Sequence, residues 1–193
     1  MNATNAELPR AGTGIRGLDD VLGGGLARNR LHLLEGSPGT GKTTIALQFL
    51  LEGAAQGEPG IYISLAETEI ELRDGALSHG WVIPKTIEIF ELVPPESVLD
   101  TEQHQSLLYS SDLELGEAIK RVFEAIERVK PKRIVIDSLS EIRLLAQSSL
   151  RYRRQILALK HYFAQNGSTV IMLDDLTAES VDRAVHSIAH SVT

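Results

Sequence analysis

The sequence predicts an α/β domain in which helices flank a mostly parallel, twisted sheet. Two observations predict this fold class. Short apolar runs alternate with longer stretches of helical periodicity, and the chain of 193 residues has the length of one domain. Hydrophobic residues make up 42% of the chain and charged residues 23%, which is the usual balance of a globular protein. A disordered or fibrous protein is therefore excluded.

Five short apolar runs have the length and composition of buried parallel strands, and the stretches between them have the period of covering helices. Right-handed crossovers are expected to connect the strands. The predicted strands are Arg30–Glu35, Gly60–Leu65, Thr86–Leu92, Arg133–Asp137 and Thr169–Leu173. The predicted helices are Lys42–Gln56, Glu69–His79, Leu113–Val129 and Ser149–Asn166, with a less regular one over Val181–His190.

Two segments fall outside this alternation. Residues 1–12 are polar with small side chains, and we expect them to form a flexible leader to the folded domain at residues 13–193. Residues 93–112 contain two prolines and show no periodicity. We expect them to form either a solvated surface insertion or a partner-binding loop.

Composition and charge restrict the environment and the partners. The chain has no cysteine, which excludes disulfides and thiolate chemistry and makes the reducing cytoplasm the expected location. No run reaches the roughly 18 apolar residues of a membrane-spanning helix, so no membrane association is expected. The net charge of −7 repels phosphate backbones unless basic residues cluster locally.

A glycine-rich loop follows the first strand and opens the first helix. Its glycines let the backbone bend around an anion, and the N–H groups of a helix N-terminus attract phosphate. In this strand–loop–helix context the pattern GxxxxGK[ST] predicts a nucleotide site rather than a chance glycine-rich turn. Lys42 would contact the β- and γ-phosphates, and the Thr43 hydroxyl would coordinate Mg²⁺. The residues of the loop are Gly36, Ser37, Pro38, Gly39, Thr40, Gly41, Lys42, Thr43 and Thr44.

An acidic residue at the end of a second buried strand completes such a site by holding the hydration shell of the Mg²⁺ ion. Asp137 ends the apolar run Arg133–Asp137, and ligands of open α/β sheets bind at the carboxyl ends of strands. We therefore predict that Asp137 binds the metal through water. The alternative is that Asp137 caps the helix that follows.

A further carboxylate is needed to position the attacking water. Glu67 follows the strand Gly60–Leu65 and is the candidate general base; the alternative is an acid in the N-terminal region of the next helix. Glu69 and Glu71 are expected to be such helix charges. Asp174 and Asp175 end the last strand and would either sense the γ-phosphate or belong to a plain loop.

Taken together, these segments resemble the KaiC-like ATPases of the RecA superfamily. Four segments carry the resemblance: TGIRGLDDVLGGGL at residues 13–26, the glycine-rich loop, IYISLAETEIELR at residues 61–73 and RIVIDSLSEIR at residues 133–143. The resemblance implies a three-layered RecA-like P-loop NTPase core over residues 13–193. It also implies ATP and Mg²⁺ as cofactors, protein signalling partners, and a homo-oligomer that would be a hexameric ring in a full-length protein.

The chain departs from the family pattern at two places. Ala66 stands where the family usually has the first of two adjacent glutamates, so hydrolysis is expected to be slow. The chain ends at Thr193, ahead of the strands whose basic residues reach a neighbouring subunit's nucleotide in the family, so these C-terminal strands are expected to be lacking. Ser187 lies near a position that some relatives autophosphorylate, but we expect an ordinary surface serine there and Ser/Thr autokinase activity only as a minor alternative.

The function these observations favour is ATP binding and hydrolysis in cytoplasmic signalling or regulation, including a circadian-clock-like role. A RecA/RadA-like DNA-repair ATPase is the first alternative, because basic residues gather late in the chain. Sparse aromatic residues and the negative net charge weigh against nucleic acid. A nucleotide-gated scaffold with little turnover is the second alternative, favoured by Ala66. The late basic residues are Arg143, Arg151, Arg153, Arg154 and Lys160.

Overall fold

The computed structural model describes residues 9–92, 107–146, 148–176, 189 and 191–192. Its main sheet has six parallel strands in the order β5-β4-β6-β7-β3-β8. Five of them are the strands predicted from the sequence, with ends that differ by no more than two residues. The strands are β3 (Leu31–Gly36), β4 (Gly60–Ser64), β5 (Ile87–Glu91), β6 (Arg133–Asp137), β7 (Thr169–Asp175) and β8 (Ser191–Val192).

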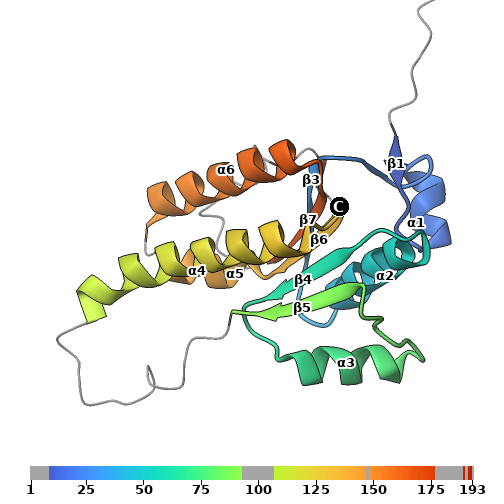
Figure 1. Cartoon of the computed structure of the whole chain (residues 1–193), viewed down its shortest axis with the longest axis horizontal. Coiled ribbons are helices and arrows are strands. Elements are labelled where there is room, and N and C mark those ends of the chain that lie inside the picture. The colour runs from blue at the N-terminus through green and yellow to red at the C-terminus, as the bar shows by residue number, and fades with distance from the viewer. Residues whose placement is uncertain (1–8, 93–106, 147, 177–188, 190, 193) are drawn as a thin grey trace, which may run out of the picture.

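Helices cover both faces of the sheet, so the predicted three-layered α/β fold is confirmed (Figure 1). On one face lie α2 (Lys42–Ala55) and α3 (Glu69–Ser78). On the other lie α4 (Leu107–Val129), α5 (Leu139–Ala146) and α6 (Ser149–Asn166). The sequence analysis missed α5 and began α4 at residue 113. The buried residues Leu139, Ile142 and Ala146 of α5 have helical spacing, but the helix is short and directly follows a strand.

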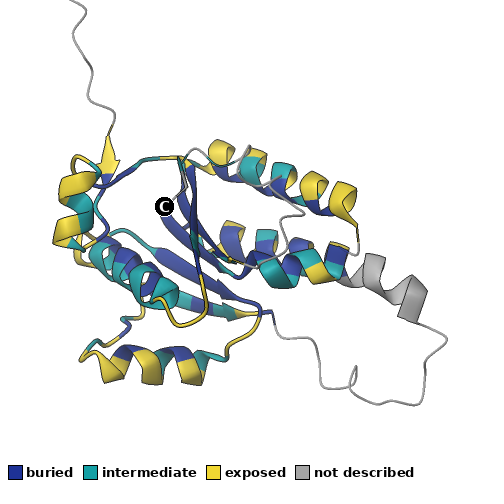
Figure 2. Cartoon of the chain, turned by 180° about the vertical axis from the view of Figure 1, so that it is seen from behind, coloured by how far each residue is buried: buried dark blue, intermediate teal, exposed yellow. Residues whose placement is uncertain are grey.

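The core has two halves, one on each face of the sheet, because successive strand residues point to opposite faces. In β6, Ile134 and Ile136 pack against α4, α5 and α6, whereas Val135 packs against the helices of the opposite face. Both faces of the central strands are therefore buried (Figure 2). This burial explains why these strands appear in the sequence as continuous apolar runs rather than as alternating ones.

The N-terminal segment forms a small antiparallel unit in which β1 (Arg10–Ala11) pairs with β2 (Leu26–Ala27), with α1 (Arg16–Val21) between them. Gly25 has φ +114°, and a Cβ there would lie 2.3 Å from the Ala11 carbonyl oxygen. Only glycine therefore fits this turn. Ala11 is fully buried, so the flexible leader expected over residues 1–12 does not extend through β1. Residues 1–8 lie outside the described residues.

Three other expectations lie largely outside the part of the chain that the structure describes. They are the segment 93–106 of the expected insertion, the helix expected at Val181–His190, and Ser187. Within the described part, none of the helices is long and apolar enough to cross a membrane.

Candidate nucleotide-binding site at the carboxyl edge of the sheet

The order of the strands brings the predicted site residues to one edge of the sheet. Gly36, the last residue of β3, pairs with Asp175 of β7. Ser64, the last residue of β4, pairs with Asp137 of β6. All these strands are parallel, so the glycine-rich loop and the acidic strand ends share the carboxyl edge, where open α/β sheets bind their ligands.

The glycine-rich loop is closed on itself at its tip. The Thr40 N–H and Oγ1 both donate to the Ser37 carbonyl oxygen, at 3.3 Å and 2.8 Å. A Cβ on Gly36 would lie 2.5 Å from Thr40 Oγ1, so a larger residue there would displace this hydroxyl from its hydrogen bond to Ser37. Gly41 is the N-cap of α2, has φ +90° and offers no side-chain cap. A helix N-terminus capped by glycine leaves its N–H groups to an anion, as the loop motif predicts.

Lys42 begins α2 and folds back over the loop. Its Nζ donates to the carbonyl oxygens of Gly36 at 2.7 Å and Ser37 at 3.1 Å. The same ammonium forms an ion pair with Asp175 Oδ1 at 2.8 Å. The sequence analysis did not predict this contact. It considered only two roles for Asp175, which were sensing the γ-phosphate and a plain loop position.

Thr43 and Asp137 meet at this edge, as the metal prediction requires. Thr43 Oγ1 donates to Asp137 Oδ2 at 3.4 Å, and the fully buried Tyr62 hydroxyl donates to the same oxygen at 2.5 Å. Burial raises the pKa of Asp137, and the bonds from Tyr62 and Thr43 oppose that rise only in part. Burial and the neighbouring carboxylate also raise the pKa of Tyr62, so this hydroxyl stays protonated and acts as a donor.

These oxygen ligands suit Mg²⁺. The ion prefers oxygen, keeps several of its waters, and binds proteins through one or two side chains together with substrate phosphates. The structure shows one hydroxyl and one carboxylate side by side next to the glycine-rich loop. Across the described residues, no group of three or more His, Asp or Glu side chains could hold a metal by itself.

Glu67 lies just past β4, in a turn fixed by Ser64. Ser64 Oγ donates to the Glu67 carbonyl oxygen at 2.5 Å and accepts from the Glu67 N–H at 3.0 Å. The Glu67 side chain is exposed. Its pKa is raised by partial desolvation and then by the charges of Asp137 and Glu71. Glu67 is therefore close enough to Asp137 to sense its charge, while its role as a base stays a prediction.

Glu71 has a structural role. Thr68 caps α3 by accepting from the Glu71 N–H, and the Glu71 carboxylate accepts from the Thr68 N–H at 2.8 Å. This reciprocal arrangement is a capping box, and its hydrogen bonds lower the pKa of Glu71. Glu69 pairs with Arg73 at 2.6 Å. Both glutamates are thus charges of the helix N-terminus, as the sequence predicts.

Asp174 is 3% exposed, and its carboxylate is directed to α5 rather than to the glycine-rich loop. Its carboxylate accepts from Arg143 Nη2 at 2.6 Å and from Ser140 Oγ at 3.0 Å, both from α5. Arg143 also lies over the Tyr152 ring, 5.1 Å from its centroid. This cation of the late basic group therefore belongs to an internal ion pair and is not part of a free basic surface.

The sequence analysis assigned no role to Tyr62, and it named Arg143 only as one of the late basic residues and not as a partner of Asp174. Tyr62 is a hydroxyl-bearing residue in the otherwise apolar run GIYISL, which was a usable signal. Arg143 gave no such signal, because its partner is 31 residues away in the chain.

The chain is similar in sequence and in structure to KaiC-related proteins. The family model described as "ATPase: KaiC" matches residues 11–193. A UPF0273 protein of Pyrococcus furiosus is 33% identical, covering 87% of this chain and 69% of its own length. The circadian clock oscillator protein KaiC of Parathermosynechococcus lividus is 33% identical over 89% of this chain, which spans 31% of that protein. The crystal structure of a KaiC-like protein from Pyrococcus horikoshii OT3 superposes with a TM-score of 0.76 at 27% identity, covering 96% of this chain and 79% of that one.

Proposed function

The chain belongs to the KaiC family of ATPases, and from that premise we propose that it binds Mg·ATP at residues 36–44 and hydrolyses it slowly. The observation that carries the proposal is the convergence of Lys42, Thr43 and Asp137 beside a glycine-capped helix N-terminus. A cation, a metal-binding hydroxyl and a carboxylate in this arrangement match the parts that P-loop enzymes use for phosphoryl transfer.

The chain's own residues would divide the work as follows. The loop amides and Lys42 hold the phosphates, and Lys42 stabilises the charge that develops on the transferred group. Thr43 and Asp137 hold the metal and its waters, with Tyr62 fixing the carboxylate of Asp137. Bound Mg²⁺ would supply further charge stabilisation.

Glu67 would position the attacking water and accept its proton. Its raised pKa makes it a stronger base than a solvated glutamate, because base strength follows pKa. Ala66 adds no second carboxylate. We therefore propose that turnover is slow, and that the switch between nucleotide states is more important than the rate of hydrolysis.

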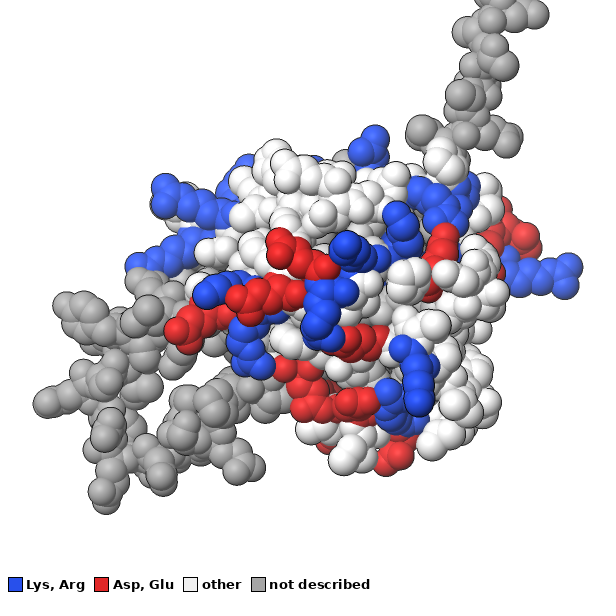
Figure 3. All heavy atoms as spheres, in the orientation of Figure 1, with Lys and Arg blue, Asp and Glu red and all other residues white. Residues whose placement is uncertain are grey.

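A regulatory role in a ring of copies is the broader part of this proposal. The name of the KaiC relative describes a circadian clock oscillator, so we extend clock-like or signalling regulation, homo-oligomer formation and protein partners to this chain as proposals. Nucleic acid is disfavoured, since Lys and Arg are interspersed with Asp and Glu across the middle of the face that carries α4 (Figure 3). The low basicity of the chain also weighs against nucleic acid.

The test combines two variants. Lys42→Ala should abolish Mg·ATP binding measured by calorimetry, whereas the exposed Lys120→Ala should bind as the parent does. Glu67→Gln should keep binding and lose phosphate release, whereas the exposed Glu124→Gln should keep both. Unchanged ATP affinity in Lys42→Ala would contradict the proposed binding site. Continued hydrolysis in Glu67→Gln would contradict the proposed base.

A further inference from the structure

The three protons of the Lys42 ammonium all have protein acceptors. A lysine ammonium offers three N–H donors and no acceptor. Its Nζ lies 2.7 Å from the Gly36 carbonyl oxygen, 3.1 Å from that of Ser37 and 2.8 Å from Asp175 Oδ1. A phosphate oxygen that binds this ammonium must therefore replace one of the three oxygens.

Asp175 is the partner that a phosphate replaces most directly. The two carbonyl oxygens belong to the loop that surrounds the phosphates, and they are neutral. The Asp175 carboxylate carries the same sign of charge as a phosphate and comes from another strand. Two like charges on one ammonium repel each other, so phosphate and Asp175 compete for Lys42.

The position of Asp175 is fixed by the sheet and not by a mobile loop. It pairs in register with Gly36, and the next residue, Leu176, donates its N–H to the Gly36 carbonyl oxygen at 3.2 Å. The Asp175 N–H donates to Asp174 Oδ1 at 3.0 Å, and Arg143 holds Asp174 in turn. The competing carboxylate is thus tethered within reach of Lys42.

The ion pair is also partly shielded from water. The Lys42 side chain is 12% exposed and that of Asp175 is 35% exposed. Strand alternation directs Asp174 toward α5 and Asp175 toward the face that carries α2. An ion pair in this setting is screened less by salt than an exposed one, so its competition persists at physiological ionic strength.

We propose that Asp175 is an affinity-determining residue that competes with nucleotide phosphate for Lys42, so that phosphate binding must displace its carboxylate. This inference rests on the proposed nucleotide site and deepens it. The chain would therefore bind nucleotide more weakly than a chain whose Lys42 is always available. The apparent affinity is the intrinsic affinity multiplied by the fraction of molecules in which Asp175 does not hold Lys42.

The test is a titration of the full chain with a non-hydrolysable ATP analogue and Mg²⁺, followed by calorimetry. Asp175→Asn removes the charge and should tighten binding by about tenfold, which corresponds to about 1.4 kcal/mol. Asp175→Glu retains the charge and should bind within about threefold of the parent. Glu88→Gln makes the same change in net charge at an ion pair with Arg128 and should leave the affinity unchanged. Affinity that is unchanged or weaker in Asp175→Asn would overturn the inference.

A second measurement needs no nucleotide and shows whether the ion pair exists in solution. Lys42→Met, Asp175→Asn and the double variant form a cycle of melting temperatures. The shift of the double variant should differ from the sum of the two single shifts, because the residues are in contact. Strict additivity would overturn the inference. Failure of the parent chain to bind the analogue would overturn the proposed function and the inference together, whereas binding that ignores Asp175→Asn would overturn the inference alone.

Discussion

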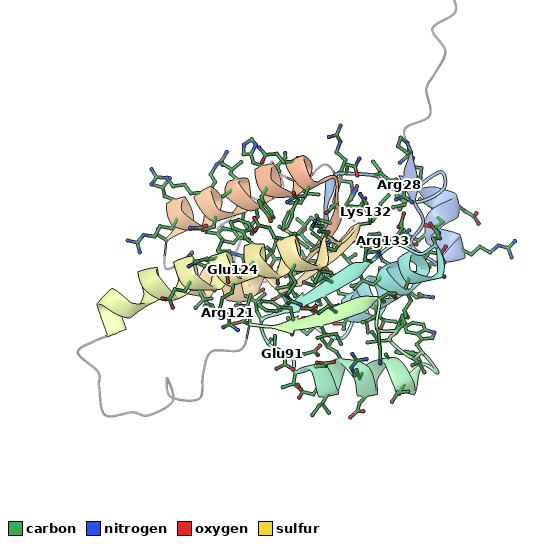
Figure 4. The ribbon with its side chains drawn as sticks, viewed as in Figure 1. Arg28, Glu91, Arg121, Glu124, Lys132 and Arg133 are labelled. Carbon is green, nitrogen blue, oxygen red and sulfur yellow. The ribbon has the colours of Figure 1, made fainter. Side chains whose placement is uncertain are left out.

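The amino edge and the carboxyl edge of the sheet both gather charged side chains, but the pKa values of their carboxylates shift in opposite directions. Arg133 begins β6 at the amino edge and is fully buried. Figure 4 places it beside Arg28 and Lys132. All three of its guanidinium nitrogens donate, to Glu58 at 2.6 Å, to the carbonyl oxygens of Gly12 and Phe49, and to Gln56.

The amino edge therefore stabilises the fold. Arg133 connects the N-terminal segment at Gly12 to α2 and the main sheet, and Glu58 is shared with Arg28 at 2.5 Å. Burial alone would raise the pKa of Glu58, but the hydrogen bonds and charges of Arg133 and Arg28 lower it below its usual value. Ionised Glu58 thus contributes to stability.

The carboxyl edge shows the opposite balance. The pKa values of Asp137 and Glu67 are both raised, first by burial and then by neighbouring carboxylates. Carboxylates whose pKa values are raised by burial and by neighbouring charges are typical of functional sites, where a bound cation can compensate their charge. The comparison shows that burial of charge does not by itself mark a candidate site, because buried Arg133 and its partner Glu58 stabilise the fold, whereas the raised pKa values distinguish the carboxyl edge.

The largest expected effect breaks the network at the amino edge. Arg133→Met removes a fully buried cation and leaves two carbonyl oxygens and one side of Glu58 without their donor, so the free energy of unfolding should fall by about 3–5 kcal/mol. Urea denaturation measures it. Arg128→Met removes an exposed arginine that also pairs with a glutamate and should leave stability nearly unchanged. Equal losses in the two variants would contradict the assigned role of Arg133.

The next effect concerns the position of the Asp137 carboxylate. Tyr62→Phe deletes the hydroxyl that donates to Asp137, and loss of such a supporting bond typically weakens metal affinity by about 10–100-fold. The Mg²⁺ dependence of nucleotide binding should shift by that amount. Tyr152→Phe removes a buried hydroxyl on the opposite face of the sheet and serves as the matched control. An identical Mg²⁺ dependence in all three proteins would show that Tyr62 only fills the core.

The smallest effect tests the direction of the pKa shifts of Asp137 and Glu58. The pKa of Asp137 is higher in the folded chain, so the folded chain holds that proton more tightly and loses stability as the pH rises above the usual value of about 4. Asp137→Asn should therefore raise the free energy of unfolding by about 1 kcal/mol at pH 7. The gain should vanish below pH of about 4. A loss of stability at pH 7 would contradict the pKa direction.

Glu58→Gln at the amino edge should change the free energy of unfolding in the opposite direction to Asp137→Asn. The pKa of Glu58 is lowered, so its contribution is present above the usual carboxyl pKa and is lost as the pH falls through the lowered value. The variant should lose stability at pH 7 and approach the parent in acid. Urea denaturation in parallel at pH 7 and at about pH 2, below the usual carboxyl pKa values, compares the two variants directly.

Much of the fold was predictable because its signals are local. The apolar runs predicted five strands within two residues, since each run is bounded by turn residues and matches a buried strand. In α4 the buried residues Leu115, Ile119, Val122 and Ile126 recur at helical spacing, which is a local signal of this helix. The sequence did not predict helix α5, because eight residues give too few turns for a clear helical period.

The same distinction between local and distant signals applies to the candidate site, whose binding role stays a prediction. The loop from Gly36 to Thr44 is one contiguous pattern, and Asp137 ends a recognisable strand. The sequence left Asp175 undecided, and it assigned no role to Tyr62. Their partners, Lys42 and Asp137, lie 133 and 75 residues away in the chain, and no local pattern encodes such separations.

By itself the sequence determined the α/β class and the positions of the glycine-rich loop and the acidic strand end, because each depends on neighbours within about one element of secondary structure. The tertiary structure alone decided which charges meet. Strand order places β7 beside β3 and β4 beside β6, and this order brings Asp175 to Lys42 and Tyr62 to Asp137. The energy of a pair depends on the distance and burial of its atoms, and only the packed sheet sets these.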